Sequence, residues 1–357
     1  MHGGDGGLGM KGNRPPRLLR ALIPLVIGLS VVGGLVFQTV EDEGGWAALR
    51  GSVVIEGWPW ALVALVGFVL ARDLGYVLRL KWLSAGTLTW KQAIETTVLW
   101  EFASATTPGI VGGGAVAIWG LHRQGMTAGR STALVFSTAL LDELFYVLVV
   151  PPVLMALGST AAPEAFDGMI GWGVFWAGYG FTLGLAVLIA SGLFLSPKAT
   201  ETTIRRIAQW RSIRRWQGAL FGFARDLRDS AHEMKALSLR VWCLAFAATV
   251  ASWTARFLAL VAVMAMVVAP FAQLDSVAIL ARQLVMWVYL LISPTPGSSG
   301  VAEWLLGAFF APWFALSSSL IAPAMTMLIW RMATHFIYLL AGVLVIPGWL
   351  RRTRRTT

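Results

Sequence analysis

Six apolar runs, each long enough to cross a lipid bilayer, constrain the fold of this chain more than any other feature. They cover residues 19–40, 58–80, 131–157, 170–195, 241–268 and 320–346. A hydrocarbon core about 30 Å thick needs about 20 apolar residues per helix. The composition agrees, because 57% of the 357 residues are hydrophobic and only 13% are charged, whereas a soluble domain has about 25% charged residues. The sequence therefore predicts an all-α polytopic membrane protein, with about six full transmembrane helices in one domain over residues 19–350.

The net charge of +10 comes mainly from three segments. These are the N-terminal tail 1–18, the linker 197–240 and the C-terminal tail 351–357. Because Lys and Arg gather on the cytoplasmic side, we expect both termini and the linker to be cytoplasmic in a cell-membrane protein. Residues 204–224 of the linker alternate basic and apolar residues, which predicts an amphipathic helix at the membrane interface. No soluble basic module is present, so nucleic-acid binding is not expected.

Two further apolar stretches are broken in the middle by the same pattern, T-P-G-x-x-G. The breaks lie 188 residues apart (295 − 107). Their residues are Thr107, Pro108, Gly109 and Gly112 in the first, and Thr295, Pro296, Gly297 and Gly300 in the second. Proline interrupts a helix and glycine permits a tight reversal. The flanking apolar runs are too short to span a membrane, so the pattern predicts two re-entrant helical hairpins.

The hairpins and the charge pattern together predict an internal repeat. Repeat one covers about 58–157 and repeat two about 241–347, and the charge rule makes the first hairpin enter from the cytoplasm and the second from outside. This is an inverted-topology repeat, which in transporters places the substrate site near the membrane midplane. The half-helices that start near Gly112 and Gly300 would direct their positive ends at an anionic group such as a phosphate. Alternatively, the breaks are kinks between packed helices that bind no ligand.

Charged residues within the apolar runs are the remaining candidates for a substrate site. They are Arg72, Asp73, Asp142, Glu143, Arg256, Glu303 and Arg331, and the candidates for contact with the substrate are Arg72, Glu143, Arg256, Glu303 and Arg331. Each costs about 2.5–3.5 kcal/mol at the centre of a membrane helix, so each should face protein or water. Glu143 and Arg331 both lie 36 residues after the threonine of their motif (143 − 107 and 331 − 295), and we expect them to pair or to face each other across a headgroup path. Ion pairs that only fix the helix packing are the alternative.

The two motifs, followed by a span that carries a charge, resemble the transmembrane region of lysylphosphatidylglycerol synthases, a flippase-like family. The resemblance covers roughly residues 15–350, and its more specific part is 293–303 together with Trp330 and Arg331. It implies movement of charged or glycosylated lipids between leaflets. The first motif departs from the family pattern at Ile110, Gly113 and Glu143. The aminoacyl-transferase domain of the full-length synthases has no counterpart in this sequence, so we do not expect an enzyme.

Three classes of function fit the sequence. The first is a lipid flippase or scramblase that moves a polar headgroup between leaflets. The others are a membrane-embedded enzyme acting on a lipid phosphate or a polyprenyl-linked substrate, and a secondary transporter of a small solute or ion. The sequence has neither a P-loop nor ligands at metal-binding spacing, so no cofactor or metal is expected. The expected partners are membrane lipids with anionic or glycosylated headgroups, and a homo-oligomer is compatible with the sequence.

Overall fold

The computed structural model describes residues 57–107, 111–163, 168–291, 300–317 and 321–353, together with the single residues 30, 33, 34, 37, 293, 295, 298 and 319. Over these ranges the chain is helical and contains no strand. Five helices are long and apolar enough to cross a membrane: Trp58–Leu83, Ala128–Leu157, Gly171–Leu195, Leu239–Val267 and Ala322–Thr353. They coincide with five of the six predicted spans. Of the sixth, at 19–40, only residues 30, 33, 34 and 37 are described, so it stays a prediction. The predicted all-helical polytopic class is therefore confirmed.

Two pairs of shorter helices flank the two sequence breaks. Helix α4 (Trp90–Thr106) packs against α5 (Val111–Arg123), and α11 (Ser276–Leu291) contacts α12 (Val301–Phe314). A reciprocal capping box between Thr89 and Gln92 fixes the start of α4. Four of the predicted turn residues lie outside the described residues: Pro108, Gly109, Pro296 and Gly297. The helical pairs match the predicted hairpins, while their depth in a membrane remains a prediction.

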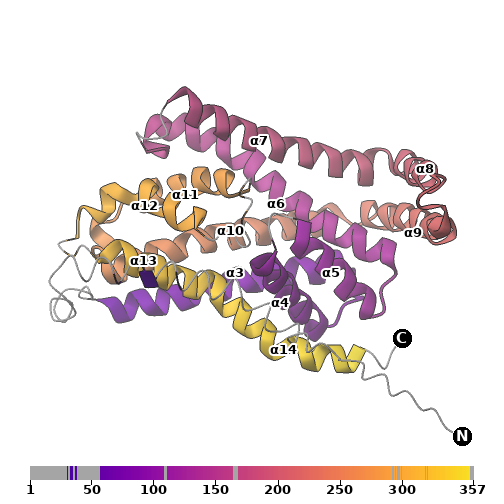
Figure 1. The fold of residues 1–357 in the computed structure, drawn as a ribbon, viewed down its shortest axis with the longest axis horizontal. Helices are drawn as coiled ribbons and strands as arrows, with labels where there is room; N and C mark the ends of the chain where they lie inside the picture. Colours follow the sequence, from indigo (N-terminus) through magenta and orange to yellow (C-terminus); the bar gives the residue numbers. More distant parts are fainter. Residues whose placement is uncertain are drawn as a thin grey trace, which may run out of the picture.

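The same order of elements occurs twice along the chain. In the first half α3 (Trp58–Leu83) is followed by α4, α5 and α6 (Ala128–Leu157). In the second half α10 (Leu239–Val267) is followed by α11, α12 and one long helix made of α13 (Ala322–Arg331), a π-helical turn at Met332–Phe336 and α14 (Ile337–Thr353). Between the halves lie α7 (Met169–Ala190) and a π-helical turn at Ser191–Leu195. Figure 1 shows α11 and α12 near one end of the long axis, and α8 (Pro197–Ile207) and α9 (Gln217–Lys235) at the other.

The first helices of the two halves, α3 and α10, pack closely along their lengths. A small residue permits this approach, because a Cβ added at Gly75 would lie 2.0 Å from Ser252 Oγ and 2.8 Å from the backbone oxygen of Ala248. Small residues at crossings allow membrane helices to gain van der Waals contact. Ser252 Oγ also donates a hydrogen bond of 3.0 Å to the backbone oxygen of Arg72. The two halves therefore meet along α3, the helix that carries the candidate residue Arg72.

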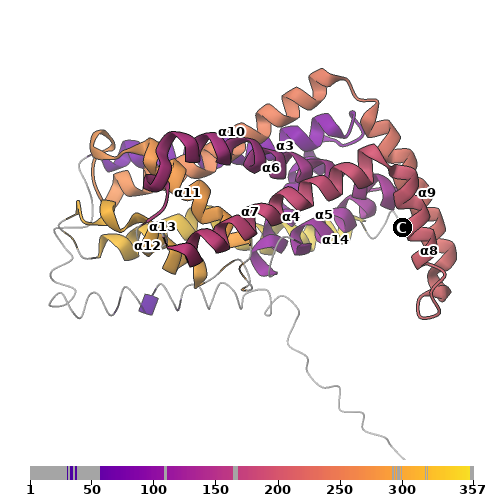
Figure 2. The ribbon, with the colours of Figure 1, turned by 90° about the horizontal axis from the view of Figure 1, so that it is seen from above.

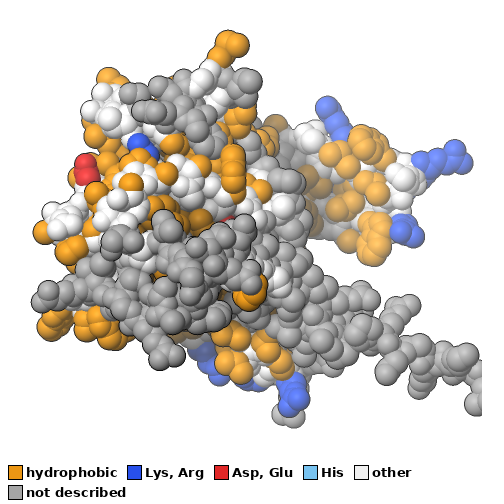
Figure 3. All heavy atoms as spheres, turned by 60° about the vertical axis from the view of Figure 1, so that its left-hand side comes forward, with side chains coloured by type: hydrophobic (Ala, Val, Ile, Leu, Met, Phe, Trp, Pro, Cys, Tyr) orange, Lys and Arg blue, Asp and Glu red, His pale blue; other side chains and the backbone are white. Residues whose placement is uncertain are grey.

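Much of the described outer surface is apolar. In the view of Figure 3 hydrophobic side chains are spread over the described surface, and charged side chains are few among them. Large side chains such as Leu70 (63% exposed), Leu188 (67%) and Val277 (67%) point outward. An apolar surface of this extent suits contact with lipid tails rather than water.

The basic linker forms two helices, α8 (Pro197–Ile207) and α9 (Gln217–Lys235), which cross the end of the bundle in Figure 2. The prediction of one amphipathic helix over 204–224 is therefore wrong, because α8 ends at Ile207 and the chain folds back so that α9 packs on α8 and α6. Ion pairs of 2.7 and 2.8 Å join Glu201 to Arg205 and Arg228. Asp226 accepts a hydrogen bond of 2.7 Å from the backbone N–H of Gly129, which docks α9 at the start of α6.

Candidate functional site

A cavity of about 290 Å³ lies between the two halves. Its wall includes Thr107 from the first break and Ser298 from the second, so the two turn segments approach one space. Four of the predicted site residues line it: Thr107, Glu143, Arg256 and Arg331. Its other polar and charged lining residues include Tyr76, Arg79, Thr97, Glu101, Ser104, Asp142, Tyr146, Gln283, Thr334, His335 and Tyr338.

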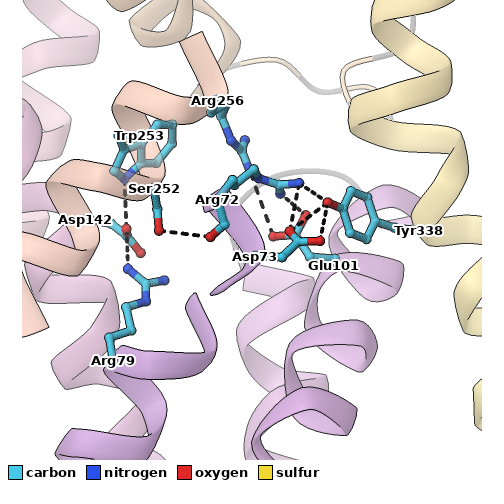
Figure 4. A network of polar contacts seen from close by, with 9 residues as sticks. All are labelled: Arg72, Asp73, Arg79, Glu101, Asp142, Ser252, Trp253, Arg256 and Tyr338. Carbon is cyan, nitrogen blue, oxygen red and sulfur yellow. Dashed lines mark hydrogen bonds and ion pairs between the residues drawn. The ribbon is translucent and has the colours of Figure 1, made fainter. Parts of the chain in front are cut away.

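The first charged cluster of this site centres on Arg72 (Figure 4). Arg72 is 1% exposed, forms an ion pair with Glu101 and donates a hydrogen bond of 2.5 Å to the hydroxyl of Tyr338. The hydroxyl of Tyr338 in turn donates to Asp73 at 2.7 Å. Nη2 of Arg256 lies 3.8 Å from Oε1 of Glu101, so this carboxylate lies between two guanidinium groups. Arg72 itself does not line the cavity; it positions Glu101 and Tyr338, which do.

Arg256 also contacts two aromatic rings of the cavity wall. Its guanidinium carbon lies 4.9 Å from the ring centres of both Trp253 and Trp287. Such cation–π contacts hold the cation while leaving guanidinium N–H groups for another acceptor. The structure thus places Arg256 at the cavity, and its contact with a ligand remains a prediction.

A second charged cluster joins three helices at Asp142. Arg79 Nη1 of α3 lies 2.5 Å from Asp142 Oδ1 of α6, and Trp253 Nε1 of α10 donates to the same oxygen at 2.9 Å. These contacts are drawn on the left of Figure 4. Arg79 is buried in this cluster, with 5% exposed.

The third cluster fixes the second hairpin turn. Arg331 Nε lies 2.6 Å from Glu303 Oε1, and Arg331 Nη2 donates a hydrogen bond of 3.2 Å to the backbone oxygen of Ser298. Glu303 Oε2 accepts a hydrogen bond of 2.6 Å from the backbone N–H of Gly300, which caps the start of α12. Direct pairing of Arg331 with Glu143 was therefore a wrong prediction. The fold places the first turn of α12 beside the end of α13, and Glu303 is the nearer carboxylate.

Glu143 differs from the other acidic residues of the cavity wall. It is 6% exposed, and no ion pair or hydrogen bond to its carboxylate occurs within the described part of the chain. Three other buried polar atoms of the lining also have no hydrogen-bond partner among the described residues: Tyr146 Oη, Arg256 Nε and His335 Nε2. His335 lies in the π-helical turn after Arg331, and such turns are frequent at functional sites. Buried polar groups normally have partners, so Glu143 and these three atoms are the candidates on the wall for contact with a ligand.

Four other predicted residues that the structure describes do not line the cavity: Gly112, Thr295, Gly300 and Glu303. A Cβ added at Gly112 would be 1.9 Å from Thr107 Oγ1, so the close turn requires glycine there. Gly300 has a φ of +84°, a conformation that favours glycine. Thr295 Oγ1 lies 3.1 Å from Ser293 Oγ. These residues, with Glu303, shape the hairpins and do not line the cavity.

Sequence reasoning did not assign three charged lining residues to the site: Arg79, Glu101 and Asp142. Asp142 was recognised only as a charge within a span. The sequence could have identified Glu101 as a site residue, because it is a carboxylate within a short apolar segment and precedes Thr107 by six positions (107 − 101). No three His, Cys, Asp or Glu side chains of the described ranges lie close enough to hold a metal ion together. The expected lack of a metal or cofactor remains a prediction.

Apolar helices of membrane-spanning length that surround a charged cavity define a polytopic helical membrane protein. The sequence profile of the lysylphosphatidylglycerol synthase TM region matches residues 22–342, and the chain belongs to this family. It is also similar to a UPF0104 membrane protein of Archaeoglobus fulgidus, with 22% identity over 303 residues, which are 79% of this chain and 84% of that protein. No solved structure matches. The family resemblance read from the sequence motifs is thus confirmed.

Proposed function

We propose that this protein moves lipids with polar or charged headgroups from one leaflet of a membrane to the other without changing them covalently. The observation that carries this proposal is the single cavity bordered by both hairpin turns, at Thr107 and Ser298, and by charged side chains of both halves. Membership in the lysylphosphatidylglycerol synthase transmembrane family supports it.

The lining of the cavity suits a headgroup that crosses while its acyl tails remain in lipid. A polar group that enters hydrocarbon without partners loses several kcal/mol per unsatisfied group. Arg256 offers guanidinium N–H groups, which bind phosphate well. The carboxyl group of Glu143 and the hydroxyl of Tyr146 offer hydrogen bonds to the polar substituents of the headgroup. The path therefore provides both donors and acceptors to a headgroup that has left water.

The proposal includes an orientation in the cell membrane. The α4–α5 hairpin enters from the cytoplasm, the α11–α12 hairpin enters from outside, and both termini are cytoplasmic. The basic helices α8 and α9 and the end of α14, which carries Arg351 and Arg352, lie toward one end of the bundle, and α11 and α12 lie toward the other (Figure 1). The positive-inside rule assigns the basic end to the cytoplasm.

The test is movement of fluorescent lipids in liposomes that contain the purified protein. Lipids with phosphoglycerol, ethanolamine and glycosylated headgroups are compared, and the fraction in the outer leaflet is followed by chemical quenching. We expect the wild type to move at least one class, and Arg256→Gln to move it at least tenfold more slowly. Arg240→Gln, an exposed substitution at the start of the same helix, is the matched control.

Two other outcomes would replace the proposal. Recovery of a lipid with altered mass would indicate a membrane-embedded enzyme. Uptake of an ion or small solute with no lipid movement would indicate a secondary transporter.

A further inference from the structure

The cavity lies on a longer seam between two helices, α4 and α14, that pack against each other. The helices run antiparallel, because Glu95 near the start of α4 pairs with Arg352 near the end of α14, at 2.6 Å, and Phe102 near the end of α4 contacts Gly342 of α14. At the Arg352 end the seam holds a groove of about 490 Å³, separate from the cavity. The groove is lined by Lys91, Ile94, Glu95 and Val98 of α4 and by Leu344, Val345, Gly348 and Arg352 of α14.

The groove combines apolar walls with cations at its end. Ile94 and Leu344 are 50% and 79% exposed, so their side chains face outward from the seam. Lys91 is exposed and has no ion pair within the described residues. Arg352 is half-exposed and uses Nη2 to bind Glu95. An acyl chain fits the apolar walls, and a phosphate fits the cations at the end of α14.

An apolar cluster separates the groove from the charged cavity along the same seam. The cluster consists of Phe102 and Ala105 of α4 with Phe336 and Leu339 on the other side of the seam. The contact is close at one point, because a Cβ added at Gly342 would lie 2.1 Å from Phe102 Cδ2. Ala105 of the cluster itself lines the cavity, as do the neighbouring Ser104 of α4 and Tyr338 of α14. Separation of α4 from α14 at Phe102 would therefore join the groove to the cavity.

We propose that the α4–α14 seam is the lateral entry for a phospholipid from the leaflet at the basic end. The acyl chain occupies the groove, the phosphate lies beside Lys91 and Arg352, and opening of the Phe102–Gly342 contact admits the headgroup to the cavity. This inference rests on the proposed lipid movement, and it names the entry point and an anionic phospholipid as the occupant.

The experiment uses liposomes that contain the full chain and a phosphatidylglycerol with a photoreactive group midway along one acyl chain. After illumination, mass spectrometry locates the labelled residues. We expect labelling at Ile94, Val98 and Leu344 at least threefold above that at Val187 and Leu188, which lie on the outward face of α7. Lys91→Gln should reduce this enrichment for phosphatidylglycerol, whereas Lys235→Gln, an exposed change in α9, should not.

Filling the groove gives the second measurement. Val98→Trp should lower both the groove labelling and the rate of lipid movement at least fivefold, whereas Leu188→Trp should leave both unchanged. Ile94→Trp serves as the second filling variant if Val98→Trp does not fold, as judged by its thermal unfolding. Uniform labelling over α4, α7 and α14, with normal movement in a filled variant, would overturn the inference.

Two results separate this inference from the proposed function. Selective groove labelling in a protein that moves no lipid would refute the proposed function and the entry role together, and leave only a lipid-binding groove. A cross-linked dimer in which a second copy covers the groove would overturn the assignment of a lipid as its occupant.

Discussion

At the scale of single residues, the organising feature is the pairing of buried charge. Arg72, Arg79 and Arg331 are each 5% exposed or less, and each contacts a carboxylate of another helix. Removing one member of a buried pair leaves an uncompensated charge, which costs about 3–5 kcal/mol. These pairs therefore hold the helices in one arrangement around the cavity. Glu143 has no such pair among the described residues, so its carboxyl group is available to a ligand.

The pair between Glu303 and Arg331 should be energetically coupled. We expect Glu303→Gln and Arg331→Gln each to lower the free energy of unfolding by about 3–5 kcal/mol, and the double change to lower it by clearly less than the sum. Glu143→Gln with Arg331→Gln should instead be additive, since these side chains do not pair. Chemical denaturation in mixed micelles measures all five variants. Additivity for the first pair would contradict the observed contact.

Glu143 and its neighbour Asp142 should respond to neutralisation in opposite ways. Asp142→Asn breaks the contacts with Arg79 and Trp253, so we expect a loss of about 3–5 kcal/mol in stability. Glu143→Gln removes a buried carboxylate that has no protein partner, so stability should stay the same or rise. Lipid movement should nevertheless fall at least tenfold in Glu143→Gln. Normal movement in this variant would show that Glu143 contacts no headgroup.

The residue-level predictions succeeded where local sequence carries the information. The motif at 293–303 with Arg331 indicated the second hairpin and its charged partner helix, and the structure joins Glu303 to Arg331. The pairing of Arg79 with Asp142 was not predictable, because it depends on how α3 lies against α6. Sequence spacing also cannot tell whether a buried arginine lines a cavity, as Arg331 does, or lies behind it, as Arg72 does.

At the scale of elements, apolar run length and Pro/Gly breaks predicted the five described spans and both helical pairs. The π-helical turn at Met332–Phe336 was not predicted, since no proline or glycine marks it. The division of the linker into α8 and α9 was also missed, because α9 is stabilised by its contacts with α6 and α8. Local periodicity does not record such contacts.

The second hairpin should depend on glycine at the start of α12. Gly300 has a φ of +84°, and nothing lies within 4 Å of an added Cβ, so Gly300→Ala introduces backbone strain without a clash. We expect a loss of about 1–3 kcal/mol in stability and slower lipid movement. Gly173→Ala is the control, because it lies within α7, has an open surrounding and should be neutral or stabilising by up to about 1 kcal/mol. Equal effects of the two changes would argue against strain at the turn.

The α8–α9 unit should loosen in acid. Burial raises the pKa of the Glu201 carboxyl, but hydrogen bonds and charges from Arg205 and Arg228 outweigh burial and hold it below its ordinary value of 4.5. A carboxylate with a lowered pKa stabilises the fold above its unfolded-state pKa, and this contribution is lost as the pH falls through the folded-state value. Hydrogen exchange of peptides from 197–235, corrected for intrinsic rates, should therefore rise below about pH 4.5. Glu201→Gln should raise exchange at neutral pH and remove this pH dependence, and an unchanged profile would exclude Glu201 as its source.

At the scale of the whole molecule, the repeated order of elements around the α3–α10 contact places both breaks at one cavity. The sequence predicted the repeat from two matching motifs, but it did not predict the cavity volume or the groove beside it. These depend on the distance between helices that are far apart in sequence, which is set by residues such as Gly75 and Gly342. The opposite entry of the two hairpins remains a prediction from the charge pattern.

That opposite entry can be tested with single cysteines in a Cys243→Ser background, since Cys243 is the only cysteine. Thr87 precedes α4 and His122 lies near the end of α5, so a re-entrant first hairpin puts both on the same, cytoplasmic side, together with Arg211 of the linker. Gln273 precedes α11 and Leu316 follows α12, so the second hairpin puts both outside. All five positions are exposed. We expect a membrane-impermeant thiol reagent to label positions 273 and 316 in intact cells, and positions 87, 122 and 211 only after the membrane is opened. Labelling of 122 but not 87 in intact cells would mean that α4 and α5 together cross the membrane, and the inverted repeat would then be wrong even if the cavity still carried lipids.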